Sequence, residues 1–407
     1  MFDVNSIRKD FPMLLNNPDL IYFDNGATSL KPQCVIDAMT DFYTTHTSNV
    51  HRGDYAIAVT NDKAYDGTRN IMAEFIHCKP SEIVYTYNIT HAMNQIAYGM
   101  AHDFLQEGDT ILITEAEHAS NVLPWFRLQE EYGMHVEYIP CDRQGNICMD
   151  AYEQCFAKYN VKAVAVAQVT NVTGAVQPVK ELCAIAHKHG AYMIVDGAQA
   201  VPHMKVDVQD LDVDFYAFSL HKMCGPGGVG ILYGKKALLD RMSPLLMGGD
   251  MNARFAKDGS CILKEAPVKF EAGTPNIEGI IGAGVAAKYL MSIGMDNIHA
   301  YEKELRAYFL EQMLKLDNIE IYNPDNIYGP IDFNAKGVFA QDAAGYLASR
   351  NIAVRSGNHC AKLLHDIIGT DSTVRASLYF YNTKEEVDRF VEAAKDITLE
   401  NAVGIFF

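Results

Sequence analysis

Short apolar runs rich in β-branched residues alternate with longer segments of helical periodicity through the middle of the chain. We expect strands at 83–87, 110–114, 136–140, 163–170, 191–196, 215–219 and 230–233. Helical periodicity lies between several of them, as at 179–190, and this alternation predicts a largely parallel sheet with helices on both faces. The near-continuous apolar character of the runs fits strands that are buried on both sides. The pattern therefore predicts an α/β fold.

The pattern changes after about residue 272. A long helical segment at 277–292 leads to another at 297–315, and shorter strands and helices follow. We therefore expect two domains. The large one covers 21–272, and a smaller α/β domain is formed by 1–20 together with 273–407.

Composition narrows the class of protein. With 407 residues the chain is long enough for two domains and a large core. Its net charge of −17 argues against a nucleic-acid binder and against docking on an anionic membrane. Residues 1–14 have mixed charge and lack the apolar segment of a targeting peptide.

Cysteine usage points to a reducing compartment. The nine cysteines are odd in number and scattered, which does not fit a disulfide framework, so we expect a cytoplasmic protein. Cys141, Cys148 and Cys155 fall at intervals of seven, but no His or Cys pair completes a zinc pattern. We therefore expect no metal site.

Polar residues follow the expected strands at the point where each strand ends. Open α/β sheets bind ligands at the carboxyl ends of their strands, so these side chains are expected to share one site. They are Thr90, His118, Asn171, Asp196, Ser219 and Lys222.

Lys222 and Asp196 form the most informative pair among them. Most lysines are solvated surface charges, but here a carboxylate stands at the end of a second expected strand. A lysine can hold a carbonyl as a Schiff base, and an aspartate can keep a pyridine nitrogen protonated. This pair therefore predicts pyridoxal phosphate as the cofactor.

The glycine run GPGGVG at 225–230 matches the spacing of a dinucleotide-binding fingerprint. That fingerprint requires a strand before the glycines and a helix after them, whereas here a strand follows. We therefore expect a tight turn near Lys222.

Five motifs together carry a family resemblance: EHASN, VDGAQA, FYAFSLHK, FEAGTPN and RSGNHCA. In this order and spacing they resemble the SufS-type (group II) cysteine desulfurases of the class V aminotransferase branch. The resemblance runs from YFDNGATSLKP to RASLYFYNTKEEVDRF, which is nearly the whole chain. It implies the fold of a fold-type I pyridoxal-phosphate transferase. A large domain binds the cofactor, and a smaller C-terminal domain carries the loop of the catalytic cysteine.

The resemblance also assigns the cofactor residues. Lys222 matches the Schiff-base lysine, which also moves protons at the substrate α-carbon, and Asp196 matches the partner of the pyridine nitrogen. His118 matches the ring-stacking imidazole, while Gln199 and Asn171 match residues near the phenolic oxygen. The residues that match phosphate contacts are Thr90, Ser219, His221 and, from a neighbouring subunit, Thr274, so the family pattern implies a homodimer.

Three further residues are expected to act on the substrate and its sulfur. Arg375 matches the arginine that binds the substrate carboxylate, beside Asn171, and Arg355 is expected to assist it. Cys360 matches the cysteine that attacks the substrate sulfur and becomes a persulfide. Its neighbours Arg355 and His359 are expected to favour the thiolate.

The expected activity is therefore conversion of L-cysteine to L-alanine, with sulfur passed to a SufE- or SufU-like acceptor for iron–sulfur cluster assembly on a scaffold. Selenocysteine lyase, cysteine sulfinate desulfinase and a class V aminotransferase remain alternatives on the same scaffold. A catalytically silent assembly subunit is an alternative of another class, although retention of both Lys222 and Asp196 speaks against it.

The sequence departs from the family pattern in four places. Asn88 and Ile89 precede Thr90 where a glycine and a threonine are usual, and Leu220 replaces a small residue. Asn358 stands where a histidine is frequent, and residues 362–364 replace a proline-containing segment. The principal expected site residues are unchanged.

Overall fold

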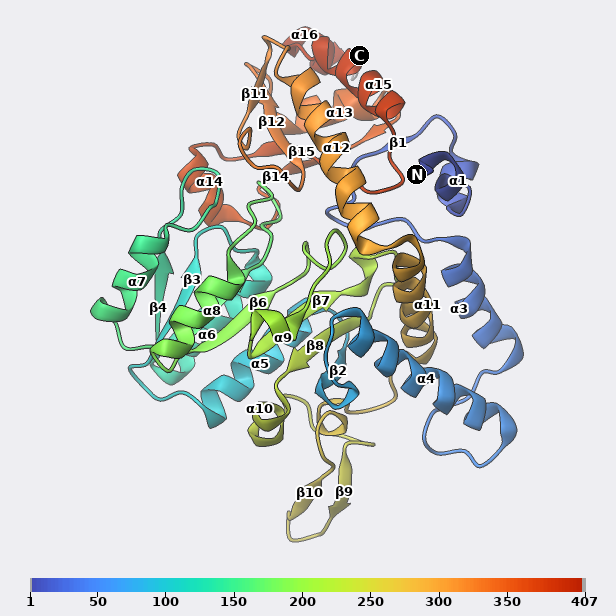
Figure 1. Ribbon diagram of the computed structural model, residues 1–407, viewed down its shortest axis with the longest axis vertical. Helices are drawn as coiled ribbons and strands as arrows, with labels where there is room; N and C mark the ends of the chain where they lie inside the picture. The colour runs from blue at the N-terminus through green and yellow to red at the C-terminus, as the bar shows by residue number, and fades with distance from the viewer. Residues whose placement is uncertain (1, 405–407) are drawn as a thin grey trace.

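A computed structural model of the protein describes residues 2–404 and is built around a seven-stranded sheet (Figure 1). The strands, in spatial order, are β2 (Ile83–Thr86), β8 (Gly230–Gly234), β7 (Phe215–Ser219), β6 (Tyr192–Asp196), β5 (Val161–Ala167), β3 (Thr110–Thr114) and β4 (His135–Ile139). Only β8 runs antiparallel to its neighbours, which confirms the largely parallel sheet. All seven expected strands are present. The expected strand at 163–170 ends at Ala167, because Thr170 enters a turn that its own N–H closes on Ala175.

Helices cover both faces of this sheet (Figure 1). They are α3 (Gln33–Thr45), α4 (Ala56–Phe75), α5 (Ile89–Asp103), α6 (Leu123–Tyr132), α7 (Met149–Lys158), α8 (Val179–Lys188), α9 (Val208–Leu211), α10 (Lys236–Arg241) and α11 (Ile277–Ile293).

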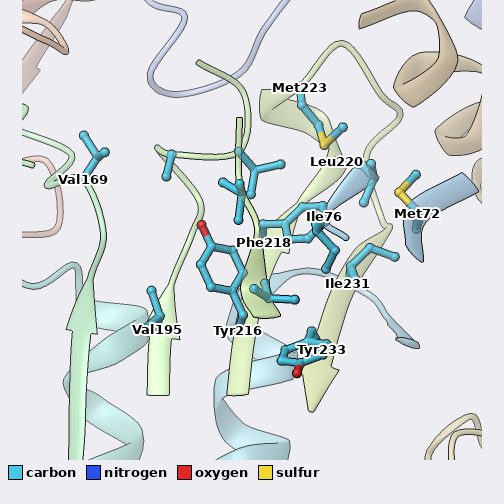
Figure 2. Packing of buried hydrophobic residues seen from close by; sticks show 14 of the residues in the cluster. Met72, Ile76, Val169, Val195, Tyr216, Phe218, Leu220, Met223, Ile231 and Tyr233 are labelled. Carbon is cyan, nitrogen blue, oxygen red and sulfur yellow. The ribbon is translucent and has the colours of Figure 1, made fainter. Parts of the chain in front are cut away.

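Successive side chains along a strand point to opposite faces of the sheet and pack into two separate hydrophobic cores. In β7, Tyr216 and Phe218 point into one core together with Met72 of α4, and Figure 2 shows them beside Leu220 and Met223. Phe215 and Ala217 point into the other, which is packed against α5 and α6. Both faces of the sheet are therefore buried, as the apolar runs predicted.

A smaller antiparallel sheet lies beyond the carboxyl edge of the large one. Its order is β11 (Ile319–Ile321), β12 (Ile331–Ala335), β15 (Thr373–Ala376) and β14 (Arg355–Gly357). The chain start joins this region, since β1 (Ile21–Tyr22) pairs with β13 (Ile352–Ala353). A third core forms here, packed by α12 (Met295–Met313), α13 (Ala340–Ala348) and α15 (Lys384–Lys395).

The change from one core to the next falls within α12. The expected helices at 277–292 and 297–315 are confirmed as α11 and α12. Apolar residues of α11 belong to the core of the large sheet, whereas those in the second half of α12 belong to that of the small sheet. Among the described residues no single helix is both long and apolar enough to span a membrane, and α11 with α12 meets the criterion only as a pair bent by 72°.

The remaining elements are short. They are α1 (Val4–Arg8), α2 (Pro12–Asn16), α14 (Lys362–Ile368), α16 (Leu399–Gly404) and the hairpin β9 (Asn252–Phe255) with β10 (Cys261–Leu263). The hairpin protrudes from the body of the molecule at the lower edge of Figure 1.

Candidate active site

Lys222 and Asp196 are brought to one edge by neighbouring parallel strands. Asp196 is the last residue of β6 and lies opposite Ala217 of β7, and Lys222 ends the 3-10 turn that directly follows β7. Burial lowers the pKa of Lys222 to about 8, and the nearby guanidinium of Arg375 acts in the same direction against the charge of Asp196. The lowered pKa favours the neutral amine, which is the form that attacks a carbonyl.

Asp196 is held in place by its own motif. The side chain is 5% exposed and accepts a hydrogen bond from the backbone N–H of Ala198 at 2.9 Å. Burial raises its pKa, while the Ala198 hydrogen bond and Lys222 oppose that shift. The intervening Gly197 lets the ring of Tyr216 approach, because a Cβ there would lie 2.1 Å from a ring carbon.

His118 and Thr90 are joined through a residue that sequence reasoning missed. The Ser120 hydroxyl lies 2.7 Å from that of Thr90 and 3.1 Å from His118 Nδ1. Burial, together with Lys222 and Arg375, lowers the pKa of His118 to about 4, so its imidazole is neutral near pH 7. A neutral ring with a fixed Nδ1 is suited to stacking on a flat cofactor.

Backbone and hydroxyl groups converge at the start of α5. The Ile89 N–H donates to Ser219 Oγ at 2.8 Å, and Asn88 caps the helix by accepting from the His91 N–H at 2.9 Å. The departures at 88 and 89 therefore have structural roles, since Asn88 is the cap and Ile89 is buried in a core. A helix N-terminus with hydroxyls beside it is a favourable place for a phosphate.

His221 lies between Ser219 and Lys222 in this turn. Its carbonyl accepts from the Ser29 N–H at 3.0 Å. Burial and the charges of Lys222 and Lys31 lower the pKa of its ring to about 4. Leu220, another departure, is fully buried in the core that Figure 2 shows.

The two predicted substrate arginines lie side by side on the small sheet. Arg355 of β14 is directly paired with Arg375 of β15. Both approach Asp24, which Arg355 contacts through Nη2 at 3.0 Å and Arg375 at 3.7 Å. Arg375 is buried and donates to the Asn171 carbonyl at 2.9 Å, whereas Arg355 remains exposed. Sequence reasoning missed Asp24, although it stands within the quoted motif YFDNGATSLKP.

Two buried polar atoms near these residues lack a hydrogen-bond partner within residues 2–404. They are Oδ1 of Asn171 and Nε of Arg375. Buried polar atoms are normally paired, so an unpaired acceptor and an unpaired donor in one place indicate room for a polar ligand.

The Cys360 loop is tied by a backbone hydrogen bond to the segment that follows β3. Cys360 is exposed, and both it and His359 have left-handed backbone angles, with φ of 57° and 52°. The Cys360 N–H donates to Asn358 Oδ1 at 3.2 Å, and its carbonyl accepts from the Ala119 N–H at 2.8 Å. Asn358, a departure from the family pattern, therefore shapes the loop as an acceptor.

The expectation that His359 provides positive charge beside Cys360 is wrong. His359 is 7% exposed and turned inward, with Nε2 at 3.0 Å from Thr373 Oγ1. Burial, with Arg375 and His365 adding to it, lowers the pKa of His359 to about 2, so the ring is neutral.

A buried polar network lies beneath this loop and was not visible in the sequence. The Thr373 hydroxyl also lies 3.3 Å from His365 Nε2 and donates to Asp332 Oδ1 at 2.7 Å. Burial raises the pKa of Asp332 to about 8, and its Oδ2 has no partner in the described part of the chain. Thr373 thus links His359, His365 and Asp332 by hydrogen bonds, and the network connects the Cys360 loop to the strand that carries Arg375.

Gln199 and Thr274 are the remaining predicted residues. Gln199 is buried and donates one N–H to the Gly26 carbonyl at 2.9 Å, which leaves its second N–H for another acceptor. Thr274 is exposed, in the loop before α11, and its neighbour Asn276 contacts the carbonyls of Gly227 and Gly228. The structure therefore places Thr274 near the glycine turn, outside the enclosed group around Lys222.

Comparison with known proteins gives a family for this arrangement. The sequence profile of "Aminotransferase class-V" matches residues 21–390. The chain belongs to this family. It is 43% identical to a "Probable cysteine desulfurase" of Halalkalibacterium halodurans, over 95% of this chain and 96% of the relative. It is also 41% identical to a "Cysteine desulfurase" of Haloferax volcanii, over 96% of each chain.

Solved structures from the same family have the same fold over the full length. The apo cysteine desulfurase from Thermococcus onnurineus NA1 superposes with a TM-score of 0.92, at 39% identity and with 97% of each chain covered. The cysteine desulfurase CsdA (S-sulfonic acid) from Escherichia coli gives a TM-score of 0.91 at 34% identity, covering 100% of this chain and 99% of that one. The chain therefore lies among the cysteine desulfurases of the class V aminotransferase family.

As a member of this family the protein depends on pyridoxal phosphate, and its residues fit that group. An amine with a lowered pKa, a buried carboxylate on the adjacent strand and a neutral imidazole match the aldehyde, the ring nitrogen and the ring face of the cofactor. The helix start at Ile89 offers a place for the phosphate.

Proposed function

We propose that this protein is a pyridoxal-phosphate-dependent cysteine desulfurase that takes sulfur from L-cysteine, forms a persulfide on Cys360 and releases L-alanine. One observation supports this reading most directly. Cys360 is exposed, yet the Ala119 backbone ties its carbonyl to the segment that carries His118. A cysteine that only filled a core would be buried instead.

The cofactor is held by the residues at the carboxyl edge. Lys222 would provide the amine, Asp196 would pair with the ring nitrogen, His118 would lie against the ring, and Gln199 and Asn171 would serve the phenolic oxygen. The proposed phosphate contacts are Thr90, Ser219, His221 and the Thr274 side chain of a second subunit. The exposure of Thr274 supports that last assignment and with it a homodimer.

The substrate carboxylate binds to Arg375, whose guanidinium is fixed by Asn171 and Asp24. Arg355 assists from the exposed side of Asp24. A planar guanidinium that is held in place can bind both oxygens of the carboxylate and so orient the substrate. This orientation determines which bond at the α-carbon points towards Lys222.

The chemical steps follow from these positions. When bound, pyridoxal phosphate provides an electron sink for the substrate α-carbon. Lys222 removes the α-proton, and the Cys360 thiolate then attacks the substrate sulfur. The new S–S bond forms as the C–S bond breaks, and its electron pair stays on the substrate β-carbon. That carbon takes up a proton to become a methyl group, and Lys222 returns a proton to the α-carbon, which gives alanine.

The later steps and the cellular setting are also proposals. The persulfide passes to a SufE- or SufU-like acceptor or to a thiol, and its sulfur supplies iron–sulfur cluster assembly. The exposure of Cys360 supports transfer to a second protein. All nine cysteines are free, which supports a reducing compartment such as the cytoplasm.

We also propose the two-domain division into 21–272, and 1–20 with 273–407. The separate cores of the two sheets support two domains. Because α11 and Ile298 of α12 pack in the core of the large sheet, the packing favours a boundary inside α12 instead of at 272.

The test is alanine formation from L-cysteine by the purified, cofactor-loaded protein with a thiol reductant. We expect alanine and sulfide in equal amounts. Cys360→Ser should keep the yellow cofactor and lose the persulfide, whereas Cys148→Ser, at another exposed cysteine, should behave like the wild type.

Full sulfur transfer by Cys360→Ser would refute the role of Cys360. Retained cleavage of cysteine sulfinate or selenocysteine by that variant, without desulfuration of L-cysteine by the wild type, would favour the alternatives that need no thiol. A colourless protein would favour a silent assembly subunit.

A further inference from the structure

Four side chains capable of binding a metal lie together at the amino-terminal edge of the large sheet, opposite the edge that holds Lys222. Cys183 and His187 stand one turn apart on α8 and so project from the same face. Asp212 and Asp214 stand in the segment that leaves α9 and enters β7 (Figure 1). The proposed desulfurase chemistry uses none of them.

The spacing of their donor atoms is that of a small metal site. Cys183 Sγ lies 3.7 Å from each ring nitrogen of His187, and His187 Nδ1 lies 3.1 Å from Asp212 Oδ2. One ligand atom from each of the three residues falls within 4.8 Å of the others. In tetrahedral zinc sites the Zn–S bond is about 2.3 Å and the Zn–N bond about 2.0 Å, so sulfur and nitrogen ligands lie about 3.6 Å apart.

Asp214 holds the imidazole in the orientation that such a site requires. His187 Nε2 lies 2.8 Å from Asp214 Oδ2, and the same oxygen accepts from the Met193 N–H at 2.8 Å. Metal-binding histidines almost always donate their second ring N–H to a carboxylate or carbonyl, which fixes the tautomer. With Nε2 donating to Asp214, the lone pair of Nδ1 is left on the side of Asp212. The Cys183 sulfur lies equally far from both ring nitrogens and donates to the Asp212 carbonyl at 3.1 Å, so the thiol has to rotate to reach the same cation.

The charges also leave room for a divalent cation. Lys235 Nζ contacts Oδ1 of Asp212 at 2.7 Å and Oδ1 of Asp214 at 3.0 Å, whereas His187 faces Oδ2 of both. Lys235 therefore occupies different oxygens and does not have to leave. Two carboxylates, one thiolate and one ammonium sum to two negative charges, which a divalent cation neutralises.

We propose that Cys183, His187 and Asp212 bind one zinc-class divalent cation, with Asp214 orienting the imidazole and water as the fourth ligand. The mixture of thiolate, imidazole and carboxylate suits this class of metal. The Asp212 side chain is 65% exposed, so the site opens to solvent on that side. The cation fastens α8 to the segment between α9 and β7.

Proton release follows from the state of the thiol. A thiol must lose its proton to bind a metal, so zinc binding displaces one proton from Cys183. The sequence analysis expected no metal because nothing in the spacing joins the pair on α8 to Asp212.

The experiment uses the cofactor-loaded protein with Cys360→Ser, so that the exposed active-site thiol does not bind the probe. Zn²⁺ is measured by equilibrium dialysis, and Co²⁺ by its ligand-field bands in the visible range. We expect one Zn²⁺ per chain, one proton released per Zn²⁺, and cobalt bands of tetrahedral intensity. Lys235→Met should increase the affinity at least threefold, because it removes a neighbouring positive charge.

Matched variants assign the site. Cys183→Ser and His187→Gln should each weaken Zn²⁺ binding at least tenfold, while Cys148→Ser and His189→Gln should leave it unchanged. Asp212→Asn should also weaken Zn²⁺ binding. Because the Asp212 side chain is exposed, this variant tests the site even if Cys183→Ser, at a buried position, fails to fold. Absence of stoichiometric Zn²⁺ binding would overturn the site, as would equal affinity in His187→Gln, Asp212→Asn and their parent. Desulfurase activity does not enter this test, so failure here leaves the proposed function untouched.

Discussion

The backbone N–H of Ala119 donates to the carbonyl of Cys360 at 2.8 Å, across 241 positions of the chain. Ala119 directly follows His118, so one hydrogen bond joins the proposed ring-stacking residue to the proposed sulfur carrier. The contact is between backbone atoms, and it therefore sets the position of the loop while leaving the thiol free. The separation of His118 and Cys360 is consequently set by main-chain geometry, which side-chain substitutions in the loop change least.

Arg375→Lys should lower kcat/KM for L-cysteine by about 100-fold while the cofactor stays bound. The lysine ammonium cannot reproduce a fork that is held by Asn171 and Asp24. Arg355→Lys is the matched control on the paired strand, and because Arg355 is exposed its loss should be below about tenfold. Steady-state kinetics with cofactor absorbance measure both. Equal losses in the two variants would contradict the assignment of Arg375 as the main carboxylate contact.

Cofactor loading of the apoprotein should depend on pH through Lys222. Only the neutral amine attacks the aldehyde, and the pKa of Lys222 is lowered to about 8. The loading rate should therefore rise about tenfold per pH unit below pH 8 and level off above it. Stopped-flow absorbance at a series of pH values measures this rate.

Arg375→Gln should move the same break point to higher pH, because Arg375 contributes to lowering the pKa of Lys222. Arg127→Gln removes a surface arginine paired only with Glu131 and is the control. A loading rate that does not change with pH would show that another step limits loading.

Asp332→Asn should change how stability depends on pH. The folded pKa of Asp332 is raised to about 8, so its contribution is fully present below the unfolded value of about 4 and is lost as pH rises towards 8. Over this window the wild type should lose about 1.4 kcal/mol of unfolding free energy per pH unit from this group, and the neutral amide should not.

Urea unfolding at pH 5 and at pH 7.5 tests this difference, with Asp317→Asn as an exposed control. The stability of Asp332→Asn relative to wild type should rise between the two pH values, and that of the control should stay constant. Parallel pH profiles for all three proteins would mean that Asp332 is already ionised at neutral pH.

Gly197→Ala should destabilise the protein by about 2 kcal/mol or more and weaken cofactor retention, because a Cβ at this position would lie 2.1 Å from the Tyr216 ring. Gly67→Ala is the contrasting case. Nothing lies within 4 Å of its added Cβ on α4, so this variant should be neutral or slightly stabilising. Thermal unfolding and cofactor release by dialysis distinguish the two, and similar melting temperatures would contradict the packing argument.

The strands of the large sheet were predicted well because each one is visible in the sequence as an apolar run. Continuous apolar runs are required when both faces are buried, and the polar residue at each strand end marks the ligand edge. Asp196 and Lys222 were placed correctly at neighbouring strand ends for this reason. Their chemical roles remain predictions.

The site features that were not predicted depend on contacts between segments far apart in the sequence. Asp24 contacts Arg355 and Arg375 only because β1 pairs with β13 and Asp24 itself bridges to Ser377 just after β15. His359 was misread because its neighbour Cys360 is exposed, whereas the left-handed backbone turns the imidazole into a buried network with Thr373. No pattern in the sequence predicts that one of two consecutive residues, His359, is buried while the next, Cys360, is exposed.

The antiparallel direction of β8 has a consequence for the reactive amine. Because β7 and β8 are adjacent and opposed, the chain returns to the sheet within the ten residues from 220 to 229 after carrying Lys222 past its edge. The amine therefore stands on a loop that is clamped at both ends by one continuous ladder, and no crossover helix intervenes. An insertion here would directly loosen Lys222, the proposed covalent anchor of the cofactor, whereas the longer connections around the same edge could absorb one. Engineering that seeks a wider substrate pocket should therefore alter those connections and leave this loop at its present length.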